Sequence, residues 1–383
     1  MKILLVPPCI LPVPAAKGGA IENTIESIIK YNEINKDHEY TVVSIYDEKA
    51  ANLSKKYKYT DIEYIKLTII DKILNKLMGT FFFDKIIFDM YCIKAKRKLK
   101  NRSFDLVIIH NRPHYYKYFK PLSKQIALHL HNDKLNKDTK NARKIAKQYD
   151  YFFSVSNYIK RKTSEVISES KIETLYNGVD FDLFQGTKNE LRRKKNRAEL
   201  GIPEGSTVFL YTGRLVAAKG VFELIKAFNK ASINRDIYLV IVGGSKNEAG
   251  SDLEYQKMLK KVANEKVIFS GYVEHSELPK YEELSDIGVV PSLFEEPFGK
   301  VVIEHLASNN RVIVSDAGGI PEIVRDLEQG VIVNRNDDFI DNLCLAIIDF
   351  SDNNMIYTAR ETVREFEIDK FNYKRLKIIN KRK

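Results

Sequence analysis

Short runs of apolar and β-branched residues recur along the whole chain, separated by stretches in which apolar positions follow a helical period. In the first half of the chain we expect strands at residues 2–6, 40–46, 104–110, 125–131, 151–156 and 172–176. In the second half we expect strands at residues 207–212, 237–242, 267–270, 287–291, 311–315 and 331–334. Strands that alternate with helices in this way predict an α/β fold with parallel sheets.

Two successive sets of strands predict two domains, each a Rossmann-like, doubly wound half. A length of 383 residues supports this division, because one hydrophobic core rarely serves so long a chain. We place the first domain at residues 1–185 and the second at residues 186–367. Residues 184–205, which hold L-R-R-K-K-N-R and G-I-P-E-G, are expected to form the linker region.

The composition is that of an ordinary globular protein, with 44% hydrophobic and 30% charged residues. Cys9, Cys92 and Cys344 are far apart in the sequence, so neither a disulfide framework nor a zinc site is indicated. The N-terminal apolar run is too short for a signal peptide, and no run approaches the roughly 18 apolar residues of a membrane span. We therefore expect a cytoplasmic location.

The net charge of +11 is concentrated in two segments. Residues 51–102 contain 13 Lys/Arg against 5 Asp/Glu, and residues 368–383 contain 7 against 1. Residues 72–102 mix lysines with Phe81, Phe82, Phe83, Ile86, Ile87 and Phe88. This mixture is typical of a basic amphipathic helix on anionic lipid, and equally of a core-facing helix with a solvated basic back. No RNA-binding or helix-turn-helix motif accompanies the charge, so no nucleic-acid partner is expected.

Ligands of doubly wound sheets bind at the carboxyl ends of the strands, which makes the polar residues there candidates for a site. After the first strand, Gly18 and Gly19 precede a helix expected to begin near Ala20, where a backbone can approach a phosphate. In the second half, Arg214 leaves a strand end and Lys219 lies at the start of a helix. Two such cations form a diphosphate clamp without a metal. A plain Gly-Gly turn and two solvated cations are the alternatives.

Residues 290–324 carry polar groups at each strand-to-helix turn. We expect there a strand end, a Pro/Gly turn, an amphipathic helix, the strand at 311–315 and a Gly-Gly loop that opens another helix at Pro321. Glu296 lies just before the first helix and Glu304 within it, about 12 Å apart if all the residues between them are helical. That separation suits two hydroxyl-rich groups of one elongated ligand, such as a sugar nucleotide. Glutamate is usually exposed, so two solvated side chains are the alternative.

Four motifs of the second half occur together in one known family. They are G-R-L-V-A-A-K-G at 213–220, V-I-F-S-G-Y-V at 267–273, P-S-L-F-E-E-P-F-G-K-V-V-I-E at 291–304 and D-A-G-G-I-P-E-I-V at 316–324. With the Gly-Gly loop and N-G-V-D at 177–180, the chain resembles the retaining family-four glycosyltransferases of the GT-B fold. The resemblance covers most of the chain. It implies two Rossmann-like domains that face each other across a cleft, with a C-terminal helix at about 368–383 that crosses back to the first domain.

The resemblance also implies an activity. A hexose would pass from a nucleoside-diphosphate sugar to a saccharide or lipid-linked acceptor on the first domain, with retention of configuration, in surface polysaccharide or glycoconjugate synthesis. Glu296 would contact the hexose hydroxyls and Glu304 the ribose, which favours a uridine or guanosine donor, with a UDP-sugar as our expectation. Arg214 and Lys219 would hold the diphosphate and stabilise its departure.

Backbone contacts to the donor follow from the same resemblance. Backbone N–H groups at the helix start would assist the cations at Phe298, Gly299, Lys300 and Val301. The base would meet the main chain of Gly271, Tyr272 and Val273. Gly18 and Gly19 would close over the phosphates from the facing domain.

The segment L-H-L-H-N-D at 128–133 ends a strand of the first half, and His131 matches the family's histidine that faces the donor sugar. A satisfied structural histidine is the alternative. At a nearby strand end, His110, Asn111 and Arg112 are candidates for acceptor binding, with Arg112 suited to an acceptor phosphate.

The D-F-D sequence at 180–182 has the form of a metal-binding motif of another glycosyltransferase fold. Here it falls in the N-G-V-D segment that leaves the first domain, and Arg214 and Lys219 already oppose the phosphate charge. We therefore expect no metal and no other cofactor.

Two other classes of protein share part of this pattern. A sugar-nucleotide epimerase of the same fold should lack the G-R-L motif joined to the two glutamates. A basic RNA- or membrane-binding protein would not need polar residues at the strand ends. If the last helix returns to the first domain, residues 72–102 and 368–383 form one basic lobe, and we expect it to dock peripherally on the inner face of the cell membrane.

Overall fold

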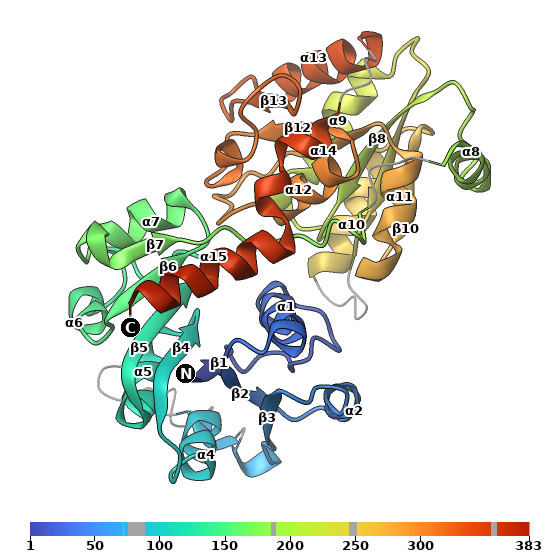
Figure 1. The fold of residues 1–383 in the computed structure, drawn as a ribbon. Helices are drawn as coiled ribbons and strands as arrows, with labels where there is room; N and C mark the ends of the chain where they lie inside the picture. Colours follow the sequence, from blue (N-terminus) through green and yellow to red (C-terminus); the bar gives the residue numbers. More distant parts are fainter. Residues whose placement is uncertain (72, 76–88, 185–188, 245–250, 354–357, 383) are drawn as a thin grey trace. The chain divides into compact units, whose positions relative to one another are not determined.

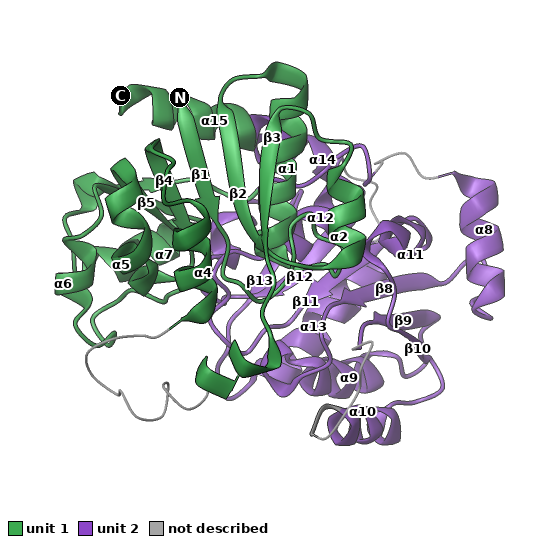
Figure 2. Ribbon diagram, turned by 90° about the horizontal axis from the view of Figure 1, so that it is seen from below, with its two compact units in different colours: residues 1–177, 371–383 green, residues 178–370 purple. Residues whose placement is uncertain are grey.

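In the computed structural model the chain forms two compact units, Met1–Asn177 with Phe371–Lys383, and Gly178–Lys370 (Figures 1 and 2). The structure describes residues 1–71, 73–75, 89–184, 189–244, 251–353 and 358–382. Each unit contains one parallel sheet connected by helices, so the expected α/β class is confirmed.

The first unit is built on a seven-stranded sheet with the order β3-β2-β1-β4-β5-β6-β7. Its strands are β1 (Lys2–Val6), β2 (Glu39–Ile45), β3 (Thr60–Ile65), β4 (Phe104–His110), β5 (Ser123–Leu130), β6 (Tyr151–Ser154) and β7 (Ile172–Thr174). All neighbouring strands pair in parallel. The central strands are buried almost throughout, which explains their continuous apolar runs.

Helices connect these strands and bury one apolar stripe each. They are α1 (Ala20–Asn35), α2 (Glu48–Ser54), α4 (Met90–Lys98), α5 (Tyr116–Phe119), α6 (Ala142–Ala146) and α7 (Asn157–Ser164), with 3-10 turns at Pro113–Tyr115, Lys120–Leu122 and Glu169–Lys171. Helix α1 buries Ile25, Ile28 and Ile29 at helical spacing. Ser156 begins α7, where its hydroxyl accepts from the backbone N–H of Ile159 at 3.1 Å.

The last helix, α15 (Ile368–Lys381), leads the chain from the second unit back to the first (Figure 1). Its Arg375 is 2% exposed and donates to the hydroxyl of Tyr40 at 2.7 Å. Arg382 donates to Glu173 at 2.8 Å, and its carbonyl accepts from the side chain of Gln125 at 3.0 Å. Part of the positive charge of the C-terminal segment therefore serves packing within the first unit.

The second unit is built on a six-stranded sheet with the order β10-β9-β8-β11-β12-β13. Its strands are β8 (Thr207–Thr212), β9 (Ile237–Val242), β10 (Val267–Gly271), β11 (Ile287–Val290), β12 (Arg311–Ser315) and β13 (Gly330–Val333). Its helices are α8 (Glu190–Glu199), α9 (Val221–Ala231), α10 (Ser251–Val262), α11 (Leu278–Leu284), α12 (Lys300–Ala307), α13 (Phe339–Asp352) and α14 (Ala359–Thr362). Four 3-10 turns lie at Ala217–Lys219, His275–Glu277, Ile320–Glu322 and Arg364–Phe366.

All twelve expected strands are present, with ends that differ by one or two residues. Strand β3 was missed, because it is an edge strand whose Asp61 and Glu63 interrupt the apolar pattern. The helix expected to open at Pro321 is wrong, since only a 3-10 turn forms there. The side chain of Gln329 accepts from the backbone N–H of Arg325 at 2.6 Å and folds this segment into a turn before β13.

The segment 184–205, expected as a linker, contains helix α8 packed within the second unit. Arg197 of α8 is 3% exposed, and its guanidinium donates to the carbonyls of Leu284 and Ser206, each at 2.8 Å. The same guanidinium pairs with Asp286 at 2.8 Å. The basic sequence of this segment therefore includes a buried structural anchor.

The basic segment 72–102 is described only in part, since residue 72 and residues 76–88, with all six Phe and Ile residues named above, lie outside the described residues. Helix α4 turns Tyr91, Cys92 and Ala95 toward the core. Lys94 pairs with Asp71, and Lys98 pairs with Glu63 at 2.8 Å. None of the helices formed by the described residues is long and apolar enough to span a bilayer.

Candidate functional site

Glu296 lies in the turn between β11 and α12 and is 7% exposed. Its Oε1 atom accepts hydrogen bonds from the ammonium group of Lys219 at 2.5 Å and from the hydroxyl of Ser292 at 2.6 Å. A buried carboxylate needs a charged or hydrogen-bonding partner, and here it has both kinds. The structure therefore brings together two residues selected from separate motifs of the sequence, and adds Ser292, which the sequence analysis did not select.

The Gly-Gly loop after β12 holds the backbone of Glu296. The backbone N–H of Gly319 donates to the carbonyl of Glu296 at 2.7 Å. Gly318 has φ +55°, and a Cβ atom there would lie 2.2 Å from the same carbonyl oxygen. These glycines therefore permit a close approach between two loops, a role that their sequence pattern alone does not reveal.

Lys219 is fixed by a similar contact at the end of β8. It closes the 3-10 turn Ala217–Lys219, and Gly220 then adopts φ +69° before α9 begins. A Cβ atom on Gly220 would lie 2.0 Å from the carbonyl oxygen of Pro291. The turn that carries Lys219 is thus packed against the strand end that leads to Glu296.

Arg214 follows β8 directly, and its side chain is exposed. Its carbonyl accepts from the hydroxyl of Tyr211 at 2.8 Å, which fixes the backbone at this position. Arg214 and Lys219 therefore both lie after the carboxyl end of β8, where a parallel sheet presents its ligands.

Glu304 is another buried carboxylate of this unit, in helix α12 and 5% exposed. Its Oε1 atom is 3.0 Å from Nε2 of His275. Burial acts to raise the pKa of Glu304, but the hydrogen bond and charge of His275, with the charge of Lys300, hold that pKa below its usual value of 4.5. His275 was not selected from the sequence, although it lies only two residues after the G-Y-V motif.

The residues expected to offer backbone contacts lie at one helix start and one strand end. Helix α12 begins after Gly299, which has φ +104°, and Phe298 before it is buried. Lys300 and Val301 are partly exposed in the first turn. At the end of β10, Gly271 has φ +73° with open space beside it, Tyr272 is 44% exposed, and Val273 is partly buried.

Gly18 and Gly19 belong to the first unit and lie between β1 and α1, which begins at Ala20 as expected. They differ in their surroundings. A Cβ atom on Gly19 would lie 2.2 Å from a carboxylate oxygen of Glu22, whereas Gly18, with φ +74°, has open space. Both glycines are favoured by their positive φ, and the open position at Gly18 leaves its backbone accessible to a ligand.

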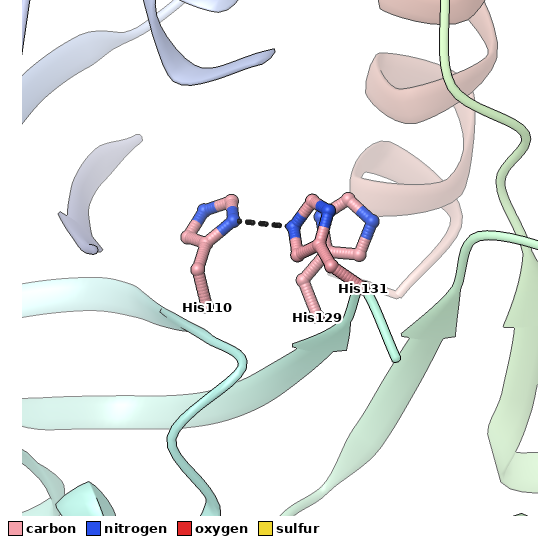
Figure 3. A group of neighbouring side chains, drawn as sticks. All are labelled: His110, His129 and His131. Carbon is pink, nitrogen blue, oxygen red and sulfur yellow. Dashed lines mark hydrogen bonds between the residues drawn. The ribbon is translucent and has the colours of Figure 1, made fainter. Parts of the chain in front are cut away.

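Three histidines gather at the carboxyl ends of β4 and β5 in the first unit (Figure 3). His110 and His129 are 0% and 1% exposed, and His131 is partly exposed. Nδ1 of His110 lies 3.1 Å from Nε2 of His131. Burial lowers the pKa of His131 to about 3 and that of the other two well below the usual value, so all three imidazoles are neutral.

The other two acceptor candidates differ in their surroundings. Asn111 has φ +57°, its side-chain oxygen accepts from the backbone N–H of His131 at 3.2 Å, and its own N–H donates to the carbonyl of His129 at 2.8 Å. Asn111 therefore joins the two strand ends. Arg112 is exposed, and its Nε donates to the carbonyl of Pro8 at 3.3 Å.

An open pocket of about 620 Å³, which was not anticipated from the sequence, lies beside the Gly18 loop. It is lined by Ala16, Lys17, Asp47, Glu48, Lys49, Asn52 and Leu53. Lys17 and Asp47 form an ion pair of 2.7 Å in its wall.

Comparison with known proteins adds a family to this geometry. Residues 192–362 match the family model described as glycosyl transferases group 1. The segment includes every candidate residue of the second unit, from Arg214 to Glu304. Spore coat protein SA of Bacillus subtilis is 29% identical over 87% of this chain and 86% of its own length. A lipopolysaccharide 1,2-N-acetylglucosaminetransferase of Salmonella typhimurium is 24% identical over 85% of this chain and 83% of its own.

Solved structures share the fold at lower identity. A glycosyltransferase of Rickettsia africae has a TM-score of 0.74 at 21% identity, with 98% of this chain and 97% of that chain covered. HepE of Anabaena, solved in complex with UDP and glucose, has a TM-score of 0.76 at 18% identity, with 99% of both chains covered. The expected GT-B fold is thereby confirmed.

Proposed function

We propose that this chain, whose residues 192–362 match the model of the group 1 glycosyl transferases, transfers a hexose from a nucleoside-diphosphate sugar to a saccharide or lipid-linked acceptor. We further propose that configuration is retained and that the product is a surface polysaccharide or glycoconjugate. The names of the Salmonella transferase and of the UDP and glucose complex of HepE support such a donor and product.

One observation carries the proposal. Two buried carboxylates of the second unit, Glu296 and Glu304, each face a basic side chain at the carboxyl ends of the strands. Buried charges are retained at a cost in desolvation, and structural packing alone rarely requires two in one strand-end region. Binding of a sugar nucleotide would explain both pairs. The carboxylates would accept hydrogen bonds from the sugar and ribose hydroxyls, and the cations would bind the diphosphate.

We assign the roles accordingly. Glu296 accepts from the hexose hydroxyls and Glu304 from the ribose, while Arg214 and Lys219 bind the diphosphate and stabilise its departure. The N–H groups of Phe298 to Val301 and the main chain of Gly271 to Val273 remain proposed contacts to the phosphates and the base. In the first unit, Gly18 and Gly19 are assigned to the phosphates, His131 to the donor sugar, and His110, Asn111 and Arg112 to the acceptor.

The proposed transfer needs no metal, because Lys219, Arg214 and the start of α12 supply positive charge for the leaving diphosphate. The D-F-D sequence supports this assignment. Oδ1 of Asp180 accepts from the backbone N–H groups of Asp182 and Leu183, each at 3.1 Å, as in a turn-forming aspartate. Activity that persists after treatment with a chelator is the expected result.

The proposed function is tested with a set of sugar nucleotides. We expect a UDP-sugar to raise the midpoint of thermal unfolding and to be hydrolysed slowly to UDP, because a ligand stabilises the state that binds it. The variant Glu304→Ala should lose this shift. A basic binding protein would bind no sugar nucleotide, and an epimerase would convert the sugar while it stays linked to UDP. Either outcome would remove the transferase assignment.

Membrane docking of the basic lobe, residues 72–102 and 368–383, stays a separate proposal. Lys96 and Arg97 are exposed on α4, whereas Lys94 and Lys98 are paired within the unit. The double change Lys96→Glu with Arg97→Glu should therefore weaken binding to phosphatidylserine vesicles. The matched control is Lys257→Glu with Lys260→Glu, two exposed lysines on α10 of the second unit. Equal binding of both variants and the unchanged chain would contradict the proposal.

A further inference from the structure

We propose that His110, His129 and His131 form a binding site for a borderline divalent transition metal, with Zn²⁺ as its representative ion. This site lies within the first unit and is separate from the donor-binding residues of the second. It goes beyond the proposed transferase activity, which needs no metal.

The fold itself brings the three imidazoles together. Strands β4 and β5 are parallel neighbours, and their register places His110 opposite His129. His131 follows His129 by two residues, so both side chains leave the chain on the same side. The ring centroids of His129 and His131 are 4.1 Å apart, and that of His110 is 5.2 and 5.3 Å from them. Sheet pairing thus fixes His110 and His129, and His131 lies one residue beyond the end of β5 (Figure 3).

The distances between the nitrogen atoms suit one ion. One possible ligand atom from each imidazole lies within 4.8 Å of the other two. Two nitrogens bound to a tetrahedral Zn²⁺ at about 2.0–2.1 Å are roughly 3.3–3.4 Å apart. The separation of 3.1 Å between Nδ1 of His110 and Nε2 of His131 is close to that value.

Unpartnered nitrogens give an independent indication of a ligand. Among the residues that the structure describes, Nε2 of His129 is buried and has no hydrogen-bond partner. Nε2 of His110 is also buried without a partner, although it is the other nitrogen of that ring, Nδ1, that faces His131. Each neutral imidazole carries one donor and one acceptor nitrogen, so a purely structural cluster should satisfy both. A buried polar atom without a partner calls for a group that supplies one, such as an ion or a water.

The chemistry of the cluster selects the class of ion. Neutral imidazoles suit Zn²⁺, Cu²⁺ and Ni²⁺, whereas Mg²⁺ and Ca²⁺ require oxygen ligands. Three protein ligands leave a fourth position open to water. The positive charge of Arg375 acts on His110 and His129, so we expect weaker binding than in a structural zinc site. The partly exposed His131 provides the route of entry.

A bound ion would be coordinated by His131, and the coordinating nitrogen could then no longer contact a sugar. If His131 contacts the donor sugar, a point that rests on the proposed function, Zn²⁺ should lower the rate of transfer and a chelator should restore it. The site would then act as an inhibitory metal site rather than as part of the catalytic machinery.

Binding is tested on the full chain without a histidine tag and without donor. We expect Zn²⁺ to compete with a chromophoric chelator at one ion per chain. Each of His110→Asn, His129→Asn and His131→Asn should weaken binding by at least about tenfold, as loss of a metal-positioning group does. His114→Asn is the matched control, since His114 lies in the same unit outside the cluster, and it should bind as the unchanged chain does.

Two results would overturn the proposal. One is a variant of the cluster that folds, by its circular dichroism, and binds Zn²⁺ as tightly as the unchanged chain, which would mean adventitious binding. The other needs no variant: Co²⁺ bound to the unchanged chain should show the intense visible bands of a four-coordinate ion, and only the weak bands of a six-coordinate ion would exclude the site. Zn²⁺ binding without inhibition would retain the site and remove only the role of His131 at the sugar.

Discussion

The two units place polar residues at the same edge of similar sheets but treat them differently. In the second unit the two buried carboxylates near the carboxyl ends of the strands are paired, Glu296 with Lys219 and Glu304 with His275. At the carboxyl ends of β4 and β5 in the first unit the buried polar side chains are neutral imidazoles, and His110 and His129 each keep one nitrogen without a partner among the described residues. The polar groups of the second unit are thus paired by opposite charge, whereas the histidines of the first unit have nitrogen atoms that are free to bind a ligand.

This difference bears on how each unit would bind its ligand. A diphosphate that reaches Lys219 must share that cation with Glu296, so donor binding in the second unit is an exchange of partners. A metal ion that reaches the three histidines does not have to replace another charged group. Metal binding in the first unit therefore breaks no existing ion pair. Variants that remove one member of a pair should therefore have large effects on transfer, and a variant of His129, to which no role in transfer is assigned, should act chiefly on metal binding.

The largest effect is expected for Lys219→Ala. The change removes a cation from the departing diphosphate and leaves Glu296 buried beside Ser292 alone. Loss of one such preorganised group lowers the rate by about 10² to 10³-fold, which we expect in kcat/KM with a UDP-sugar. Lys226→Ala is the control, because Lys226 is exposed on α9 of the same unit. A kcat/KM for Lys219→Ala within twofold of that of the unchanged chain would contradict the proposal that the diphosphate binds Lys219 in exchange for Glu296.

The two glutamates should separate into different kinetic classes. Glu296→Ala should lower kcat by about 10²-fold with little change in KM, because the contact we propose for it, to the hexose, serves the reacting sugar. Glu304→Ala should instead raise the KM for the donor by about tenfold, since the ribose contact is equal in ground and transition states. Steady-state kinetics over a range of donor concentrations measure both. If both variants transfer at the unchanged rate, the donor site is elsewhere.

The sequence predicted the second unit better than the first. Arg214, Lys219, Glu296 and Glu304 stand in motifs with fixed spacing, and the structure joins Lys219 to Glu296 directly. The partner of Glu304 was missed, because a histidine in a 3-10 turn carries no spacing signal. The histidine cluster was missed as a cluster, since His110 and His129 meet only through strand register, a long-range property that local patterns do not show.

A smaller effect is expected for His275→Ala, and it depends on pH. The pKa of Glu304 is held below 4.5, so its charge contributes to donor binding above that value and is lost as pH falls through the folded-state pKa. Without His275, burial acts unopposed by this partner and raises the pKa. The acid limb of donor binding should therefore move to higher pH, with a rise in KM of about three- to tenfold at neutral pH.

His275→Gln keeps a hydrogen-bond donor and should recover most of the KM at neutral pH. An acid limb at the same pH in His275→Ala and the unchanged chain would show that the pair is structural only. The position of the acid limb therefore distinguishes a histidine that is only a neighbour of Glu304 from one that positions it.

The smallest effect is expected when the ribose of the donor is replaced by deoxyribose. If Glu304 accepts from the ribose diol, a 2′-deoxyuridine-diphosphate sugar should bind about three- to tenfold more weakly than the ribose form, the size of one typical net hydrogen bond. In Glu304→Ala the two donors should bind equally, because the group that distinguishes them is absent. The coupling between donor and variant, measured as in a double-mutant cycle, isolates this single contact. If the unchanged chain and Glu304→Ala prefer the ribose donor to the same degree, Glu304 does not contact the ribose. The pair of Glu304 with His275 would then serve folding alone.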